Sequence, residues 1–366
     1  MNQYNAILNK DEQVAFELRS LYRSYGYLPY KMSKFEEYDL YVRNKDFLVS
    51  DNVITFTDTN GRLMALKPDV TLSIIKNGRD AEGLVEKVYY NENVYRISKG
   101  THSYKEIMQT GLECVGAIDA YRIGEVVSLA AESLKKISDR SVLDLSHLDM
   151  VSAVLNDAGL SEAGKQKIYS FLGEKNLHGV LRVCTEEGIA QAAVEAVKTL
   201  VTLYGAPEKV LPALKSLCPA AQPYVAQLQE LIGQLRENGL ADTVRLDFSV
   251  IPDMHYYNGI VFRGFVDGIP TGILSGGQYD KLLRKMGRKA QAIGFAVYLD
   301  LLEELAEDAE YDVDTVLLYD ETDTPASVAA AVKKLAKTGS VTALRQIPAK
   351  LTYKTCISVK EVNSRG

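Results

Sequence analysis

The spacing of apolar positions predicts a helix near the start of the chain and a hairpin after it. Residues 11–26 place apolar side chains three and four positions apart and end in a glycine, which predicts an amphipathic helix. Residues 53–70 contain two alternating stretches around an Asn-Gly pair at 60–61, which predicts a β-hairpin with a type I′ turn. Pro68 then favours the start of a short helix, with Thr71 in its first turns.

Further alternation predicts most of a sheet, and a helical stretch separates its two parts. Two strands and then a helix are expected at 87–97, 104–117 and about 120–138. Residues 148–240 are rich in Ala and Leu at helical spacing, with Gly- and Pro-containing breaks, and predict five or six helices. Strand patterns return at 244–250, 259–266 and 270–275.

Two glycine-led segments follow these strands, and both are expected to be helical. The stretch "SGGQYDKLLRKMG" at 275–287 predicts a glycine turn that leads into a helix. The stretch "AIGFAVYLDLLEELAED" at 292–308 predicts a second helix. The end of the chain contains a strand, a helix and short strands, which predicts a small α/β piece.

The order of these elements favours an α+β fold. Residues 1–147 and 243–310 are expected to supply the two parts of one mixed, largely antiparallel sheet. Residues 148–242 would form an all-helical insertion, and 311–366 a short C-terminal α/β segment. No P-loop and no G-x-G-x-x-G follows a predicted strand, so we expect neither a doubly wound nucleotide-binding sheet nor a cofactor.

Composition and charge narrow the function. The 366 residues include 42 basic and 48 acidic side chains, for a formal charge of −6, without a dense block of Lys or Arg. Proteins that bind nucleic acid through its phosphates usually show a basic face, so the charge disfavours a large RNA footprint. The absence of a tRNA partner is expected only from the family resemblance given below. The 22 Tyr suit pockets for polar ligands, because each joins an apolar ring to a polar tip.

Cysteine and histidine usage argues against a metal site. The four Cys are scattered without metal-ligand spacing and only four His occur, which predicts reduced thiols in a reducing compartment. The first residues lack the basic and apolar regions of a signal peptide. No run approaches the ~18 apolar residues of a membrane span, so we expect a cytoplasmic protein.

Five polar stretches at predicted strand ends or turns are candidates for a ligand site. They are 66–71, Arg96, 109–113, 251–266 and 275–280. On a strand, Gln109 and Glu113 share one face, where an amide and a carboxylate can accept hydrogen bonds from a ligand amine. Alternative interpretations are a solvated face for this pair and a helix-start carboxylate for Asp69. One of Tyr256 and Tyr257 is expected to pack in a core under either interpretation.

Taken together and in order, five stretches resemble the histidyl-tRNA synthetase family of class II aminoacyl-tRNA synthetases over about residues 1–305. They are "TFTDTNGRLMALKPDVT", "VYRISKGTHSYKEIMQTGLECVG", "YYNGIVF", "SGGQYDKLL" and "AIGFAVYLDLL". The resemblance implies a class II synthetase-like antiparallel sheet flanked by helices, usually in a dimer. It also implies histidine as the ligand.

The resemblance further implies the residues of a histidine pocket. The family has a Pro-Glu-x-Thr stretch that helps to hold the amino group of histidine, and it matches residues 68–71 here. The family's amine-contacting Gln and Glu match Gln109 and Glu113, and pocket tyrosines match Tyr257 and Tyr279. With Arg96 for the ligand carboxylate, the implied set is Asp69, Thr71, Arg96, Gln109, Glu113, Tyr257 and Tyr279.

Departures from the family pattern fall on the groups that activate histidine with ATP. The Arg of the family's Arg-Gly-Leu-Asp-Tyr-Tyr stretch is replaced by Pro252, and the Glu of its Arg-x-Glu pair by Ser98. The third motif's ATP-binding Arg falls on Leu301, and the first motif's Pro on Ser33. Losing one preorganised electrostatic group typically costs ~10²–10³ in rate. We therefore expect histidine binding without adenylation, and no catalytic residue.

Within this family, the same combination is similar to the regulatory subunits of the short-form ATP phosphoribosyltransferase, the first enzyme of histidine biosynthesis. That resemblance implies a noncatalytic partner for the short catalytic subunit, with histidine as the effector of feedback inhibition. It also implies a homodimer within a hetero-oligomer. The alternative is an active histidyl-tRNA synthetase-like ligase that activates histidine with ATP.

Overall fold

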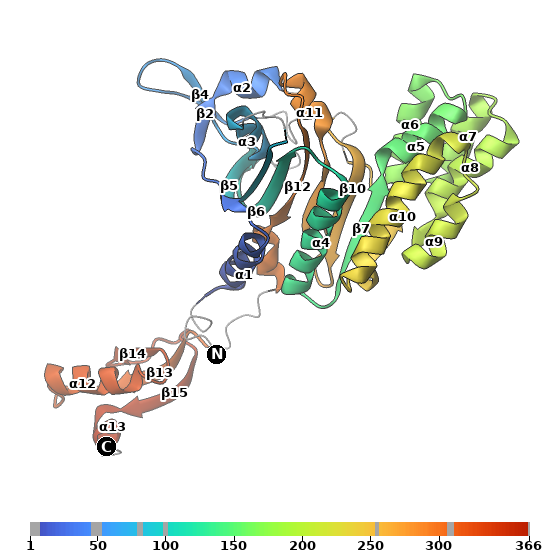
Figure 1. Cartoon of the computed structure of the whole chain (residues 1–366). Helices are drawn as coiled ribbons and strands as arrows, with labels where there is room; N and C mark the ends of the chain where they lie inside the picture. Colours follow the sequence, from blue (N-terminus) through green and yellow to red (C-terminus); the bar gives the residue numbers. More distant parts are fainter. Residues whose placement is uncertain are drawn as a thin grey trace. The chain divides into compact units, whose positions relative to one another are not determined.

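The computed structural model describes residues 8–44, 53–78, 83–97, 102–252, 256–305 and 311–364. The chain divides into two compact units, Met1–Leu305 and Ala306–Gly366 (Figure 1). Each unit is described by itself. The first unit contains every residue of the implied histidine pocket.

A nine-stranded sheet forms the centre of the first unit, in the order β1-β5-β6-β12-β11-β10-β7-β9-β8. The strands are β1 (Leu28–Pro29), β5 (Val85–Ile97), β6 (Tyr104–Gly116), β7 (Ser141–His147), β8 (Tyr204–Gly205), β9 (Val244–Asp247), β10 (Asn258–Val266), β11 (Leu274–Gln278) and β12 (Gln291–Tyr298). The β1–β5 and β7–β9 pairs are parallel and the other pairs antiparallel. The predicted α+β class, with one mixed and largely antiparallel sheet, is confirmed.

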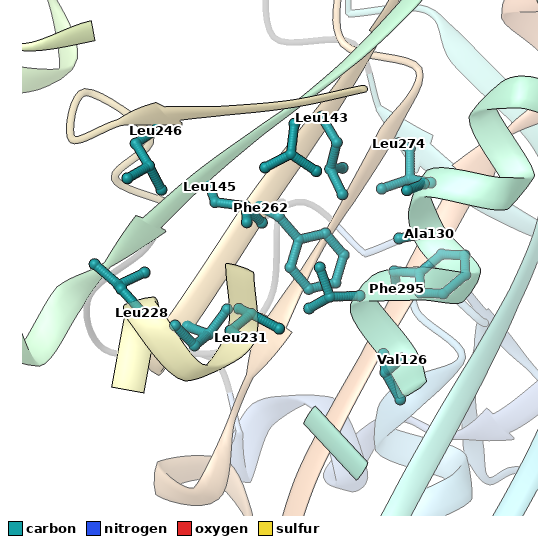
Figure 2. Close-up of a cluster of buried hydrophobic side chains, with 14 of the residues drawn as sticks. Val126, Ala130, Leu143, Leu145, Leu228, Leu231, Leu246, Phe262, Leu274 and Phe295 are labelled. Atoms are coloured by element: carbon teal, nitrogen blue, oxygen red, sulfur yellow. The ribbon is translucent and has the colours of Figure 1, made fainter. Parts of the chain in front are cut away.

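Alternation along the strands gives this sheet one apolar face. Phe262 on β10, Phe295 on β12 and Leu145 on β7 are buried in one cluster with side chains of α4 (Ala120–Ile137) and α10 (Gln222–Glu237) (Figure 2). Burying each such side chain contributes ~1.5–3 kcal/mol relative to exposure. The side chains between them face the opposite side of the sheet, where the polar residues of the site lie.

The helical segment between β7 and β9 confirms the expected run of helices. It contains α5 (Leu148–Asp157), α6 (Glu162–Gly173), α7 (Leu177–Glu186), α8 (Gln191–Thr202), α9 (Pro207–Leu214), the 3₁₀ turn η2 (Pro219–Ala221), α10 and the 3₁₀ turn η3 (Ala241–Thr243). These helices gather at the end of the sheet to which β7 belongs (Figure 1). Whether the first unit should be divided at 148 and 242 stays a prediction.

Short elements complete the first unit. They are α1 (Lys10–Ser24), α2 (Tyr38–Arg43), α3 (Thr71–Asn77), α11 (Asp280–Lys285), the 3₁₀ helix η4 (Leu299–Leu305) and a sheet of β2 (Phe35–Glu37), β4 (Leu63–Leu66) and β3 (Thr55–Thr57). The helix predicted at 11–26 is confirmed by α1. The hairpin predicted at 53–70 is confirmed by the antiparallel β3–β4 pair.

The second unit is a small α/β piece, as predicted. Its parallel sheet has the order β14-β13-β15. The elements are β13 (Val313–Leu318), α12 (Pro325–Leu335), β14 (Val341–Leu344), β15 (Tyr353–Ser358) and α13 (Val359–Ser364). Its core is a separate cluster that includes Leu317, Ala331 and Val362.

One glycine-led prediction was wrong and the other was half right, because the helix expected within 275–287 is confirmed by α11. Residues 291–298 form the central strand β12, not a helix, and only the 3₁₀ helix η4 follows. Gly276 and Gly277 lie inside β11, not in a turn. A Cβ on Gly276 would stand 2.4 Å from the carbonyl oxygen of Gly294, so glycine permits the close approach of β11 and β12.

Three local details also differ from the predictions. The strand β7 was not predicted. Its sequence does contain apolar residues on both sides of Asp144, among them Val142 and Leu145, which is compatible with a strand. Asn60 has no positive φ, and the Gly61 N–H donates to the Asp58 carbonyl, so the turn is not type I′. Helix α3 begins at Thr71 rather than at the preceding proline.

Candidate functional site

A cavity of about 950 Å³ lies over the polar face of the central sheet. Its walls include Asp69, Thr71, Arg96, Gln109, Glu113, Tyr257 and Tyr279. The structure therefore brings together all the residues that the sequence selected. They come from the start of α3, from β5 and β6, and from the segments before β10 and α11.

Small side chains make the floor of this cavity. Gly111 on β6 pairs with Ala296 on β12, which in turn pairs with Ser275 on β11. A Cβ on Gly111 would lie 2.6 Å from the Tyr90 hydroxyl, and one on Gly294 would lie 1.7 Å from a Glu113 carboxylate oxygen. Larger residues here would displace the polar groups, so the small residues leave room for both the polar groups and a ligand.

Glu113 is the centre of a buried hydrogen-bond cluster at one end of the cavity. Its side chain is 2% exposed. The Thr71 hydroxyl donates to one carboxylate oxygen at 2.8 Å, and the Tyr279 hydroxyl donates to the other at 2.5 Å. Burial raises the pKa of Glu113 to about 8, against the effect of these two hydrogen bonds. At pH 7 such a group is mostly protonated, and one of the two hydroxyls then accepts from it instead of donating. An incoming ammonium would ionise it.

Gln109 lies on the same face of β6 as Glu113, with Gly111 between them. Its residue is 3% exposed, and it lines the cavity. Among the residues that the structure describes, its side-chain amide makes no hydrogen bond. A buried amide without a partner favours a ligand that supplies the missing donor or acceptor.

Asp69 and Arg96 form the rim beside this cluster. The Asp69 carboxylate accepts from the Leu72 N–H at 2.9 Å, so its role as a helix-start carboxylate is confirmed, and it also lines the cavity. Burial raises the pKa of Asp69, while the neighbouring Arg96 acts in the opposite direction. Arg96 donates from Nε to the Pro68 carbonyl at 3.0 Å, which holds its guanidinium at the cavity edge.

Three tyrosines form one wall of the cavity. The ring centroids of Tyr256 and Tyr257 are 4.5 Å apart, and those of Tyr256 and Tyr279 are 5.6 Å apart. Tyr256 is buried in an apolar cluster with Tyr41 and Leu72, which confirms that one of the tyrosine pair packs in a core. Tyr257 is half-buried, and burial raises the pKa of its phenol, which stays a hydrogen-bond donor at neutral pH.

The positions that depart from the family pattern lie in different places. Pro252 lines the cavity, where the family pattern has an arginine. Leu301 packs against the main core, and Ser33 is exposed. Ser98 and residues 253–255 lie outside the described residues.

The far end of the cavity contains polar residues that the sequence did not suggest. They are Asp144, Lys175, Asp247, Ser249 and Arg263. Ser275 and Tyr298 were also missed, but they lie closer to the Glu113 end, because Tyr298 is the cross-strand partner of Gln109 and its hydroxyl bonds to Ser275. Asp144 was missed because β7 was missed. Arg263 could have been found from alternation, because it is the charged residue in the otherwise apolar run of β10.

Two further searches cover only the described part of the chain. No group of three or more His, Cys, Asp or Glu side chains there could hold a metal ion. No helix there has both the length and the apolar character that crossing a membrane requires.

The sequence of the chain matches a known protein family. A family model of histidyl-tRNA synthetase matches residues 5–302. The ATP phosphoribosyltransferase regulatory subunit of Ruminiclostridium cellulolyticum is 25% identical over an alignment of 325 residues, which covers 86% of this chain and 77% of that protein.

Two solved structures share the fold. One is an ATP phosphoribosyltransferase regulatory subunit/histidyl-tRNA synthetase from Bacillus halodurans, with 24% identity, a TM-score of 0.76 and coverage of 95% of this chain and 93% of that chain. The other is a chain of the ATP phosphoribosyl transferase complex from Thermotoga maritima, with 18% identity, a TM-score of 0.63 and coverage of 79% and 97%. Because the family model spans most of the first unit, this chain belongs to the histidyl-tRNA synthetase family.

Proposed function

We propose that this chain is a noncatalytic regulatory subunit of ATP phosphoribosyltransferase, which binds histidine in the cavity and couples it to the activity of a short catalytic chain. The name of the Ruminiclostridium relative supports the partner. The observation that supports histidine as the ligand is the buried hydrogen-bond cluster of Glu113, which lies beside the unpartnered Gln109 amide.

The proposed pose follows from charge. The α-ammonium of histidine would lie at Glu113 and Gln109, where a carboxylate and an amide oxygen accept its hydrogen bonds. Arg96 would bind the α-carboxylate from the rim. Tyr257 would flank the imidazole. Catalysis is disfavoured because Pro252 supplies no cation to stabilise charge on an activated carboxylate.

The deciding experiment reconstitutes the complex. A short catalytic chain is assayed for phosphoribosyl-ATP formation alone, with this protein, and with this protein plus histidine. We expect this protein to raise the rate and histidine to lower it, with a coupling of ~1–3 kcal/mol, or roughly 5–150-fold. An unchanged rate and no complex on sizing would refute the regulatory role. Histidine-dependent pyrophosphate exchange by the isolated chain would instead favour the ligase.

A site variant tests the pose. Glu113→Gln keeps the size and hydrogen-bonding geometry of the neutral acid, so it should fold, but it removes the charge that an ammonium requires. A charged hydrogen bond contributes ~1.5–3 kcal/mol, so calorimetry should show histidine bound roughly 10–150-fold more weakly. Glu162→Gln, at a carboxylate that is 85% exposed on α6, is the matched control and should bind like the parent. Equal affinity of both variants would place histidine elsewhere.

A further inference from the structure

The cavity is longer than one amino acid. Glu113 lies on β6 and Asp144 on β7, and the sheet places β12, β11 and β10 between them. Adjacent strands are ~4.8 Å apart, so the floor between the two carboxylates spans about 19 Å. A histidine held at Glu113 therefore leaves the Asp144 end open. We call that end, formed by Asp144, Asp247, Ser249 and Arg263, the distal site.

Asp144 is an unpaired acceptor in the distal site. It is 7% exposed, and its Oδ1 atom has no hydrogen-bond partner. Its neighbour Asp247 is satisfied, because it pairs with Lys175 Nζ at 2.7 Å and accepts from the Ser249 hydroxyl. Asp144 lines the cavity, and its other carboxylate oxygen, which is not among the fully buried atoms, is the one that a ligand donor can reach.

Arg263 is the matching cation. It is the cross-strand partner of Asp144 in the β10–β7 pair, so both side chains lie on the cavity face. Its guanidinium lies over the Phe265 ring at 5.5 Å, and its Nε would be 2.3 Å from a Cβ on Gly272. Among the described residues it forms no ion pair, with Asp144 or with any other carboxylate.

The distal site thus presents a carboxylate and a guanidinium that form no ion pair among the described residues. We propose that it is a second amino-acid site, in which Asp144 accepts from the α-ammonium and Arg263 binds the α-carboxylate of a free amino acid. A phosphorylated ligand fits less well, because a dianion would face Asp144 and Asp247 with one free arginine. Val250, Ile251 and Phe265 form the adjoining wall and suit an apolar or aromatic side chain.

The charge state of Asp144 agrees with this role. Burial, and then the nearby Asp247, raise the pKa of Asp144 to about 6, while Lys175 and Arg245 act in the opposite direction. The carboxylate is therefore mostly ionised at neutral pH and can pair with an ammonium. This site does not depend on histidine binding at Glu113.

Calorimetry with three variants separates the two ends of the cavity. The probes are leucine, histidine and, as the competing chemistry, ribose 5-phosphate. We expect leucine or histidine to bind a site that Asp144→Asn and Arg263→Met each weaken at least tenfold and that Glu113→Gln leaves intact. If histidine is the distal ligand, the parent binds two histidines and Asp144→Asn binds one. If leucine is the ligand, histidine binds one site in both.

Three outcomes would contradict the distal site. The proposal would be overturned if neither distal variant changed the affinity for an amino acid. It would also be overturned if those variants weakened the binding of ribose 5-phosphate and of no amino acid. Arg263 is an exposed residue, so Arg263→Met should fold even if Asp144→Asn does not. Loss of binding only in Glu113→Gln would support the histidine pocket and reject the distal site.

Discussion

At the residue scale, the protonation of Glu113 makes ligand binding depend on pH. Its pKa of about 8 in the folded protein means that the carboxyl group is neutral at pH 7. An α-ammonium requires the ionised form, so histidine binding should expel close to one proton from Glu113 at about pH 7. Calorimetry in buffers of different ionisation enthalpy should measure that release, and affinity should rise toward pH 8.

Glu113→Gln is the control for this proton release. It has no acid to titrate, so its remaining histidine binding should release no proton from this position. Histidine binding to the parent without proton release would mean that the ammonium does not meet Glu113.

Residue-scale prediction worked where a motif linked the residues. Asp69, Thr71, Gln109, Glu113, Tyr257 and Tyr279 all line the cavity, as does Arg96. Their convergence depends on strand register, which the sequence alone does not specify, and the family pattern supplied it. No motif contains Asp144 or Arg263, and their pairing across β7 and β10 appears only once those strands are aligned.

At the element scale, the wrong prediction at β12 has a physical cause. Residues 291–298 are buried on both faces of a central strand, so they form a nearly continuous apolar run with no clear alternation. Short apolar runs fit a buried helix equally well, and pairing with β6 and β11 decided the outcome. Where one strand face is polar, as in β6, the prediction was correct.

A second element-scale feature is the joint between the sheet and its helical segment. His147 ends β7 and caps α5, where Nδ1 accepts from the Met150 N–H at 3.3 Å. The neutral ring must then donate from Nε2 to the Gln227 side-chain oxygen on α10, at 2.9 Å. One buried imidazole thus connects a strand and two helices.

This imidazole should make stability depend on pH. Burial lowers the pKa of His147 below its usual value of 6.5. The unfolded chain takes up a proton first on acidification, so this contribution is full above about pH 6.5 and is lost as pH falls. The variant His147→Asn retains a helix cap but lacks this titrating group. Below pH 6.5, its free energy of unfolding in urea should therefore fall less steeply than that of the parent, by up to about 1.4 kcal/mol per pH unit.

His178 supplies the comparison for that measurement. It is exposed on α7, so His178→Asn should follow the parent's pH dependence. If His147→Asn also follows the parent, the acid sensitivity of the protein arises at other groups.

At the scale of the whole molecule, the helical segment contributes directly to the cavity. Gly173 and Lys175, at the end of α6, line its distal end, and Lys175 pairs with Asp247, the last residue of β9. A ligand at that end therefore contacts both the sheet and the helical segment. Such a ligand can shift an equilibrium between two arrangements of them only by its difference in affinity for the two.

The second unit should not be needed for the folding of the first unit or for histidine binding. Its apolar cluster is distinct from those of the first unit, and each cavity residue lies before residue 306. A chain ending at Leu305 should therefore fold and bind histidine within about twofold of the full chain, because no cavity contact is removed. Scanning calorimetry of the full chain should show a second transition that the shortened chain lacks.

If shortening abolished histidine binding while the first unit stayed folded, the second unit would have to act on the cavity. If it abolished only activation of the catalytic chain, the second unit would be assigned to partner binding, and the histidine site would remain as proposed.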